Sequence, residues 1–404
     1  QVWRRGREIA RYVGGNANTL DPTSFVEFYA LHNDGRLDAE LYKNAQDQPH
    51  PYYSFYTDTA SYFVTWSVGG IARSGRLMNQ PGATGGTPHP HRLSNQLNLK
   101  VNFYLDTPVE RFNYLPWLEP GEGFFGGGTI TVLSDSVIRN VAPTGPAPQV
   151  EVMMFGANEL PHATEVLVVP PTGAERSLGV IQWTGRTRGR KTFSFLRSDV
   201  NSAGKVAIKY RLDASHVAGD NYYACYIRVV APQLNRWFTA SHAISFQNDS
   251  LLTGSATYEF EADSIPATVV GFDVQDLYNV QRVVSTVGSS ATRRRFVFPD
   301  ANASATHWLL LADEARPAVP PLRAGRVYFR AINPALPTFV IITHPQLMRR
   351  DPATGIANAA KEYASYRASA AGGLYDTLLV TAPQLYDQFY YGDRSWLALR
   401  HFSR

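Results

Sequence analysis

Nucleophilic catalysis needs a reactive side chain such as a thiol, and Cys225 is the single cysteine of this chain. Counting in steps of two along NYYACYIRVV (221–230) places Cys225 on the same strand face as Tyr223, Ile227 and Val229. That face reads as the apolar core face of a sandwich strand, where a thiol stays protonated and unreactive. Cys225 is therefore predicted to be a core residue and not a nucleophile.

His344 ends an apolar stretch within TFVIITHPQLM (338–348). One interpretation is catalytic, because α/β sheets place ligands at the carboxyl ends of parallel strands. The other is structural, because Pro345 forces the chain out of the sheet. A lone histidine without a partner does not identify a catalytic site. The structural interpretation is favoured.

Oxygen ligands for a metal gather near the start of the chain. Asp21, followed by Asn33, Asp34 and Asp38 in NDGRLD, could hold Ca²⁺ in a tight turn. The full loop pattern of a calcium hand is absent, and a hairpin turn at Asn33-Asp34-Gly35 explains the same residues. No cofactor and no metal are expected, and Ca²⁺ at these four residues stays as the open alternative.

Other polar groups have simpler interpretations. His89 and His91 could bind a metal only with ligands from elsewhere, and their Gly/Pro-rich surroundings predict a flexible loop. Glu119 and Glu122 have no second acidic motif placed opposite them, so a glycosidase is not supported.

The composition is that of a β-rich globular protein. The 404 residues include 22 Tyr, 21 Phe, 31 Gly and 26 Pro, while only 18% are charged, which is typical of short strands joined by many turns. A net charge of +4 is too small to argue for nucleic-acid binding, and no apolar run approaches the roughly 20 residues of a membrane-spanning helix. Basic turns at 186–191 and 293–295 could touch an anionic glycan or a partner, but solvated loops are the simpler interpretation.

Changes in pattern divide the chain into four parts. Residues 1–145 form an N-terminal β domain, which ends at a Pro-rich linker around 141–150. Regularly spaced strands at 146–245 predict an antiparallel β-sandwich. Residues 246–335 form a further β-rich region, and 336–404 read as the start of an α/β domain.

The α/β reading depends on an alternation of elements. TFVIIT (338–343) is apolar on successive residues, as expected of a strand covered on both faces. An Ala-rich helix is predicted within 356–373, followed by a second apolar strand at 376–382.

Two short helices are predicted to close the sequence. Pro383 opens the first, QLYDQFYYG, and Asp393 is predicted to cap the second, RSWLALRHFSR. Two parallel strands with these helices cannot cover both faces of a sheet, and so small a sheet is marginal. The α/β domain is therefore expected to continue past Arg404 or to be completed by another chain. The strand-like opening of the chain suggests further sequence upstream as well.

These residues resemble a known family. FVIITHPQL (339–347), EYASYRASAAG (362–372), LLVTAPQLYDQFYYG (378–392) and ALRHF (398–402) resemble the start of the gingipain-type cysteine peptidase domain, and more closely its sortase-like members in type IX secretion systems. Upstream stretches such as NDGRLD and SFYTDTASYFVTW resemble the regions that precede this domain in the same proteins. His401 departs from the family, which usually has an acidic residue there.

The resemblance implies a caspase-like α/β domain with a Cys–His dyad on later strands. No catalytic residue is assigned here, the dyad is expected beyond Arg404, and this chain by itself should be inactive. The resemblance further implies a cysteine endopeptidase at the outer surface of a bacterial cell, which cleaves the C-terminal sorting domain of secreted cargo alongside other secretion components. The alternative is a non-catalytic binding module, for a glycan or a secretion partner, in a degenerate peptidase.

Overall fold

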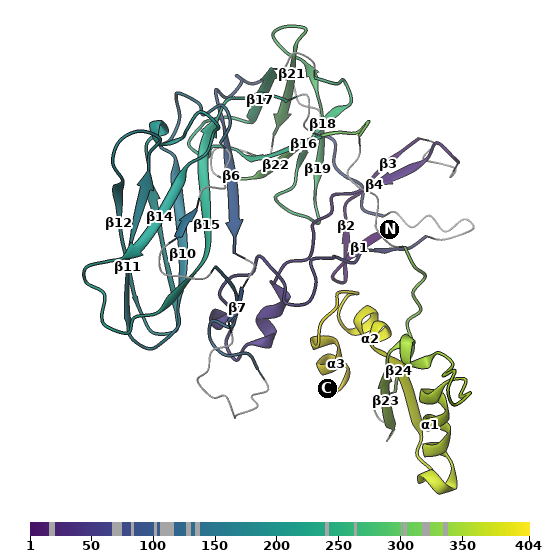
Figure 1. Cartoon of the computed structure of the whole chain (residues 1–404). Helices are drawn as coiled ribbons and strands as arrows, with labels where there is room; N and C mark the ends of the chain where they lie inside the picture. Colours follow the sequence, from purple (N-terminus) through teal and green to yellow (C-terminus); the bar gives the residue numbers. More distant parts are fainter. Residues whose placement is uncertain are drawn as a thin grey trace.

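The structure is a computed structural model that describes all residues except 16–20, 67–74, 82–84, 101–102, 106–116, 127–130, 134–137, 239–241, 262–264, 300, 302–304, 317–323 and 334–337. It is mainly β, as predicted, with a small α/β unit at the C-terminal end of the sequence (Figure 1). None of the described helices is both long and apolar enough to cross a membrane.

An eight-stranded antiparallel sheet runs through most of the molecule. In spatial order its strands are β13 (Arg188–Ser194), β10 (Gln149–Gly156), β15 (Tyr222–Gln233), β6 (Arg92–Leu99), β16 (Ala243–Gln247), β22 (Trp308–Asp313), β18 (Val269–Asp273) and β19 (Gln281–Val284). Because β6 pairs with both β15 and β16, a strand from the first predicted domain lies in the middle of the sheet. The predicted limits near residues 145 and 245 therefore do not coincide with breaks in the sheet.

The predicted sandwich is confirmed. A second sheet, in the order β12 (Arg176–Thr184), β11 (Pro161–Val169), β14 (Ala207–Leu212) and β9 (Thr131–Leu133), packs on the β13-β10-β15 end of the large sheet (Figure 1). The core between them consists of inward side chains from both sheets, such as Val152, Val166, Ile208 and Ile227, each at most 1% exposed. This alternation is what a half-buried antiparallel strand requires.

A second core lies at the other end of the large sheet. The three-stranded sheet of β17 (Ala256–Glu261), β21 (Arg293–Phe298) and β20 (Thr286–Val287) packs there through buried aromatic rings. Phe246 meets Tyr258 edge-on with ring centroids 5.1 Å apart, and Phe260 meets Phe296 in the same way. Edge-to-face pairs of this kind suit the charge distribution of aromatic rings.

The N-terminal region consists of small hairpins and turns. β1 (Val2–Arg4) pairs with β2 (Arg7–Ile9) and β5 (Phe63–Val64), β3 (Tyr12–Gly14) pairs with β4 (Phe25–Glu27), and β7 (Phe103–Leu105) pairs with β8 (Gly123–Phe125). Arg5 and Gly6 both have positive φ, as a two-residue hairpin turn requires. The short 3-10 helices η1 (Leu37–Leu41) and η2 (Ala45–Asp47) follow, and η4 (Arg197–Asp199) lies in the sandwich.

The hairpin predicted at Asn33-Asp34-Gly35 is wrong. No strand flanks it, and Gly35 does not have positive φ. The chain turns there into η1, and glycine is required because a Cβ at residue 35 would lie 2.5 Å from the carbonyl oxygen of Tyr53. The sequence signal marked a close backbone approach rather than a tight turn.

The α/β unit has the predicted order of elements. β23 (Phe339–Thr343) and β24 (Thr377–Thr381) are parallel, and α1 (Ala359–Ala368) connects them with the short turns η5 (Pro345–Met348) and η6 (Ala370–Gly372). The Asn358 side chain caps α1, and Thr381 with Gln384 forms a capping box for α2 (Ala382–Phe389).

One expectation for β23 is not met. Phe339 contacts Tyr363 of α1, but Val340 and Ile342, which point to the opposite face, are each 43% exposed. Among the described elements, none covers that face. The strand is apolar on successive residues yet half-exposed in this structure.

Candidate functional site

His344 lies directly after β23, as the structural interpretation predicted. Its ring nitrogen Nδ1 accepts a hydrogen bond from the backbone N–H of Gln346, 3.3 Å away, and so caps the turn η5. The side chain is exposed, and no other contact of the ring is seen in the described part of the chain. His344 ends a strand, and its one described side-chain contact is the cap of η5.

Cys225 is fully buried, and burial raises the pKa of its thiol well above the ordinary value. The predicted face is wrong, however. The pairing of β15 with β10 slips between Met153 and Met154, so that a β-bulge reverses the alternation at Cys225. Ile227 and Val229 point into the sandwich core, whereas Cys225 lies on the other face of the sheet.

On that face Cys225 belongs to a separate cluster with Phe125, Met153, Phe155 and Tyr226. We expect the native chain to resist alkylation by iodoacetamide, because the protonated, enclosed thiol is a poor nucleophile. After unfolding in urea the same thiol should react as a free cysteine. Peptide mass spectrometry of both samples checks this. Rapid labelling of Cys225 in the native protein would contradict the assignment.

The four candidate calcium ligands are engaged by other groups. Arg5 donates to Asn33 Oδ1 at 3.0 Å and to Asp34 Oδ1 at 3.3 Å. Asp38 is buried and accepts a hydrogen bond from the backbone N–H of Phe55 at 2.8 Å. Asp21 Oδ1 accepts from Thr23 within its own turn.

Among the described residues, no group of three His, Cys, Asp or Glu side chains could hold a metal ion. Calcium binding at these four residues stays a prediction. The contacts of Arg5 with Asn33 and Asp34 argue against it.

The residues around Asn33 belong instead to a contact that sequence reasoning missed. The turn between β1 and β2 meets the turn that follows α2, more than 380 residues along the chain; we call this the turn-to-turn contact. Arg4 donates to both carboxylate oxygens of Asp393, at 3.0 and 2.9 Å. The two side chains are 3% and 1% exposed, so the ion pair is buried.

Further bonds complete the turn-to-turn contact. The backbone N–H of Ser61 donates to Asp393 at 3.1 Å, and the Ser61 hydroxyl donates to the Gly392 carbonyl at 2.8 Å. Gly392 has a φ of +81°, and a Cβ there would lie 2.6 Å from the Cβ of Ser61. Only glycine allows both the backbone conformation and the close approach. Burial raises the pKa of Asp393, and the Arg4 guanidinium opposes that rise.

Asp393 was predicted to cap the last helix, and this is wrong. Helix α3 (Leu397–Phe402) begins after Trp396, and no side chain caps it. The Asp393 carboxylate points to Arg4 instead, because a buried arginine needs a charged partner.

A second contact joins the same parts of the chain at η1. His401 Nε2 lies 2.9 Å from the Glu40 carboxylate, and Nδ1 lies 3.1 Å from the Phe389 carbonyl oxygen. Arg400 donates to the Glu40 carbonyl at 3.1 Å. His401, the departure from the resembled family, therefore binds an acidic partner on another segment.

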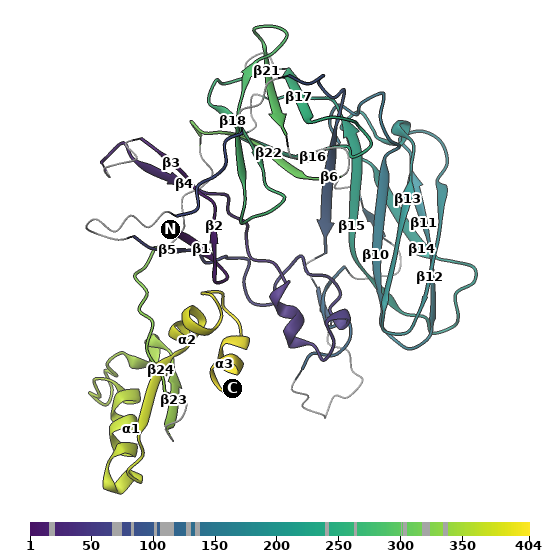
Figure 2. The ribbon, with the colours of Figure 1, turned by 180° about the vertical axis from the view of Figure 1, so that it is seen from behind.

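A shared hydrophobic core lies between these two polar contacts. Leu41 and Tyr42, from the N-terminal region, pack with residues of β24, α2 and α3, namely Val380, Leu385, Tyr390, Leu397 and Ala398. Figures 1 and 2 both show α2 and α3 (yellow) facing the N-terminal hairpin and η1 (purple). The α/β unit is thus held by residues 2–61 and not only by the chain that leads into it.

His89 and His91 are not in a flexible loop, contrary to prediction. They are 7% and 2% exposed, and His91 Nε2 lies 2.8 Å from the Asp249 carboxylate. His89 meets the ring of Tyr258 edge-on, and burial lowers the pKa of His89. The Gly- and Pro-rich segment around His89 and His91 is irregular, as its composition indicated, but it is buried by tertiary packing.

The basic turns are largely neutralised within the chain. In the first turn, Arg186 Nε lies 3.2 Å from the Glu159 carboxylate and Arg190 Nε lies 4.0 Å from Glu151. In the second turn, Arg293 and Arg295 both pair with Glu259. These turns offer less free charge than the sequence suggested.

Glu259 gives this pairing a pH dependence. Although burial acts to raise it, hydrogen bonds from Ser289 and Arg295 lower the pKa of Glu259 from 4.5 to about 2. Stability from this carboxylate is therefore present above pH 4.5 and lost as the pH falls toward 2. Replacing Glu259 with glutamine should lower the free energy of unfolding at pH 7, and the deficit should shrink as the pH falls from 4.5 to 2.

Urea unfolding of wild type and variant across this pH range measures the effect. Glu261→Gln is the matched control, because its carboxylate is 62% exposed and should contribute little. A deficit for Glu259→Gln that does not change with pH would contradict the assignment.

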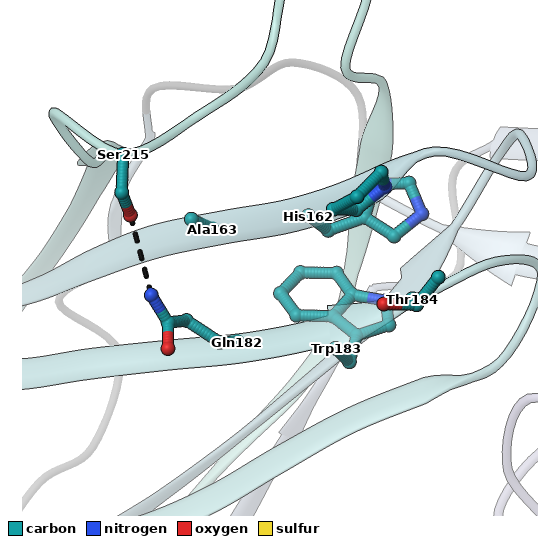
Figure 3. A pocket seen from close by; sticks show the side chains of 7 residues that line it. His162, Ala163, Gln182, Trp183, Thr184 and Ser215 are labelled. Atoms are coloured by element: carbon teal, nitrogen blue, oxygen red, sulfur yellow. Dashed lines mark hydrogen bonds between the residues drawn. The ribbon is translucent and has the colours of Figure 1, made fainter.

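Two surface hollows lie on the sandwich. The first is lined by β11, β12 and Ser215, and Figure 3 shows His162 beside Trp183 at one end and Gln182 bound to Ser215 at the other. The Trp183 ring lies 4.9 Å from the His162 ring, and a Cβ at Gly189 would lie 2.4 Å from it. The indole therefore packs against His162 and Gly189 and is only half-buried.

His162 lines this hollow, and its side chain is fully buried. Its Nδ1 lies 2.5 Å from the Asp220 carboxylate, and Nε2 lies 3.2 Å from the Gly185 carbonyl oxygen. These two contacts hold the imidazole ring in place between its neighbours. His162 thus joins the segments that contain Asp220 and Gly185. No pattern in the sequence indicates that His162 and Asp220, which are 58 positions apart, form a contact.

Comparisons with known proteins bear on the end of the chain. Residues 333–404 match the model of peptidase family C25. This segment resembles the start of the gingipain-type peptidase domain. The predicted resemblance is confirmed there, and we call residues 333–404 the C25 segment. No curated protein sequence matches the chain.

A solved structure extends the likeness in fold. Dimeric latent PorU from Porphyromonas gingivalis matches 99% of this chain with a TM-score of 0.64 and 13% sequence identity. The chain spans 34% of the length of that PorU chain. At this identity the match establishes a shared fold for the β regions and the C25 segment together.

Two further structures match a smaller part. A carbohydrate-binding module, CBM36, in complex with calcium and xylotriose covers 34% of this chain and 98% of its own length, at 16% identity. The CBM36-1 domain of a xylanase from the hindgut metagenome of Trinervitermes trinervoides covers 34% and 96%, at 9% identity. Both have a TM-score of 0.21, which is too low to support a conclusion about this chain.

Proposed function

We propose that this chain is the N-terminal part of a gingipain-like cysteine endopeptidase of a type IX secretion system. In this proposal the whole protein is a sortase that cleaves the C-terminal sorting domain from secreted cargo at the outer cell surface of a bacterium. The observation that carries the proposal is the C25 match at residues 333–404. A fold shared with PorU over nearly the whole chain supports it.

The reaction would use a thiolate that attacks the scissile carbonyl carbon. A histidine would take the thiol proton and pass it to the leaving amine, while backbone N–H groups stabilise the oxyanion. Cys225 is a poor candidate for the thiolate, because it is buried, burial raises its pKa well above the ordinary value, and its cluster contains no residue of the C25 segment. In this proposal the nucleophile is a cysteine that the present sequence does not contain.

In this proposal, residues of the N-terminal region stabilise the start of the peptidase domain. The turn-to-turn contact and the shared core tie β24, α2 and α3 to the N-terminal region. The β regions would then be available to cargo and to other secretion components. The second candidate, a non-catalytic module that binds a glycan or a secretion partner, is favoured by the second surface hollow of the sandwich, which Arg139 and Arg197 line.

Incubation of the full natural protein with a peptide spanning a cargo sorting-domain junction tests the proposal. We expect cleavage, detected by mass spectrometry, that iodoacetamide abolishes, whereas the present chain alone should leave the peptide intact. Capture of the cargo without cleavage by the full protein would support the binding module instead. Cleavage that survives iodoacetamide would contradict a cysteine mechanism.

A further inference from the structure

The second surface hollow lies at one end of the sandwich, away from the C25 segment. It has a volume of about 390 Å³ and is lined by residues 138–141 and 200–204, with Arg197 and Phe238. This volume is within the range of small-molecule sites, which lies at roughly 300–1,000 Å³. Among the described residues, its lining includes two arginines and no acidic side chain.

Neither arginine is neutralised by a carboxylate in the described part of the chain. Arg197 donates to the backbone carbonyls of Ala142, Gly145 and Pro146, at 2.7–2.9 Å. Carbonyl oxygens orient the guanidinium but leave its charge uncompensated. Asp199, two residues on, is bound to Arg176 instead, with the closest atoms 2.6 Å apart. The hollow therefore concentrates positive charge.

Arg139 is the side chain able to hold a ligand. Its guanidinium carbon lies 5.7 Å from the ring centroid of Phe238, and no described residue forms a hydrogen bond or an ion pair with it. An aromatic ring supports a guanidinium through its face while leaving the N–H groups free. That fork of donors matches the two oxygens of a carboxylate, or two oxygens of a sulfate or phosphate.

The walls of the hollow are held in place by the backbone. Ile138 donates to the Gly204 carbonyl at 2.5 Å, and Leu234 donates to the Asn140 carbonyl at 2.9 Å. Asn140 has a φ of +53°, an uncommon conformation for a residue other than glycine. The side-chain oxygen of Asn201 accepts from the N–H groups of Ala203 and Lys205, which fixes the opposite loop. A site whose walls are already held loses little entropy when a ligand binds.

We propose that this hollow binds a small molecule through an oxyanion group, with Arg139 as the primary donor. Arg197 adds electrostatic attraction, and the polar side chains of Asn201 and Ser202 line the opposite wall. The first hollow, at Trp183, is not a candidate for such a ligand, because none of the described residues that line it is an arginine or a lysine. The proposal concerns the sandwich alone and stands apart from the peptidase function.

Titration of the purified chain with four probes at constant ionic strength tests this. The probes are sodium glucuronate, sodium sulfate, inorganic phosphate and, as the neutral reference, glucose. We expect saturable binding of at least one anion, seen by calorimetry, and none of glucose. Glucuronate alone would assign a carboxylate ligand, whereas sulfate or phosphate would assign a tetrahedral one. Failure of all three anions to saturate the chain would overturn the proposal.

Variants locate the binding. Arg139→Gln should weaken the affinity about tenfold or more, because a charge-assisted pair is lost. Arg139→Lys keeps the positive charge but loses the paired N–H donors of the guanidinium. Its affinity should lie between those of wild type and Arg139→Gln. Arg349→Gln is the matched control, since Arg349 is exposed in the distant α/β unit, and it should bind as wild type. Equal thermal unfolding temperatures exclude misfolding, and undiminished binding by Arg139→Gln would refute the assignment.

Discussion

Replacing Arg4 with alanine should lower the free energy of opening of the α2–α3 region by about 3–5 kcal/mol, because it leaves a buried carboxylate without its partner. Asp393 is 1% exposed, and Arg4 is its closest cationic partner, with contacts of 2.9 and 3.0 Å. Arg5 lies 4.0 Å away and cannot replace both bonds. Hydrogen exchange of peptides covering residues 382–402 measures the loss.

Two controls separate the ion pair from general damage. Arg36→Ala removes an exposed ion pair with Asp34, whose arginine is 67% exposed, and should cost no more than about 1 kcal/mol. The double variant Arg4→Ala/Asp393→Ala should recover part of the loss, since no unpaired charge remains buried. If Arg4→Ala proves no more costly than Arg36→Ala, the turn-to-turn contact does not hold the unit.

Truncating Leu397 to alanine should cost about 2–5 kcal/mol, as expected for a large side chain removed from a packed core. Leu397 is 1% exposed and lies in the core that α3 shares with Leu41 and Tyr42 of the N-terminal region. The loss of stability should therefore affect the N-terminal segment as well as α3. We expect faster hydrogen exchange at residues 37–56 as well as at 382–402.

Leu374→Ala is the matched control for this truncation. Leu374 belongs to the same α/β unit but is 73% exposed, so its loss should change stability by no more than about 0.5 kcal/mol. Faster exchange confined to residues 382–402, with 37–56 unchanged, would show that the two segments do not share a cooperative core.

The N-terminal region supports the C25 segment through both polar and apolar contacts. Segments near residues 1–61 and 380–402 meet through a buried ion pair, a close approach at Gly392 and a common core. If the whole protein is the proposed peptidase, the N-terminal region is part of the structural support of its α/β fold. Substitutions there would then reduce activity without touching a catalytic residue.

Local patterns in the sequence predicted the kinds of elements well. Alternating strands and Gly/Pro turns indicated the sandwich, and successive apolar residues with an Ala-rich helix indicated the parallel pair β23 and β24. Each of these signals acts over a few residues, where backbone sterics and side-chain direction decide the outcome. The family resemblance of the C25 segment rested on the same short stretches.

Counting residues in steps of two could not predict irregularities within a strand. The bulge at Cys225 reversed the face on which the thiol lies, because one extra residue breaks the period of two. His89 and His91 were predicted to be mobile and are buried, since composition describes a loop but not what packs over it.

What the sequence determined by itself was the β-rich class, the order of elements and the inert character of the one thiol. Only the tertiary structure decided that β6 enters the middle of the large sheet, that Asp393 meets Arg4 instead of capping a helix, and that Arg139 and Arg197 line one hollow. The physical reason is distance along the chain. Pairings between residues hundreds of positions apart depend on how whole sheets pack, and no local preference encodes them.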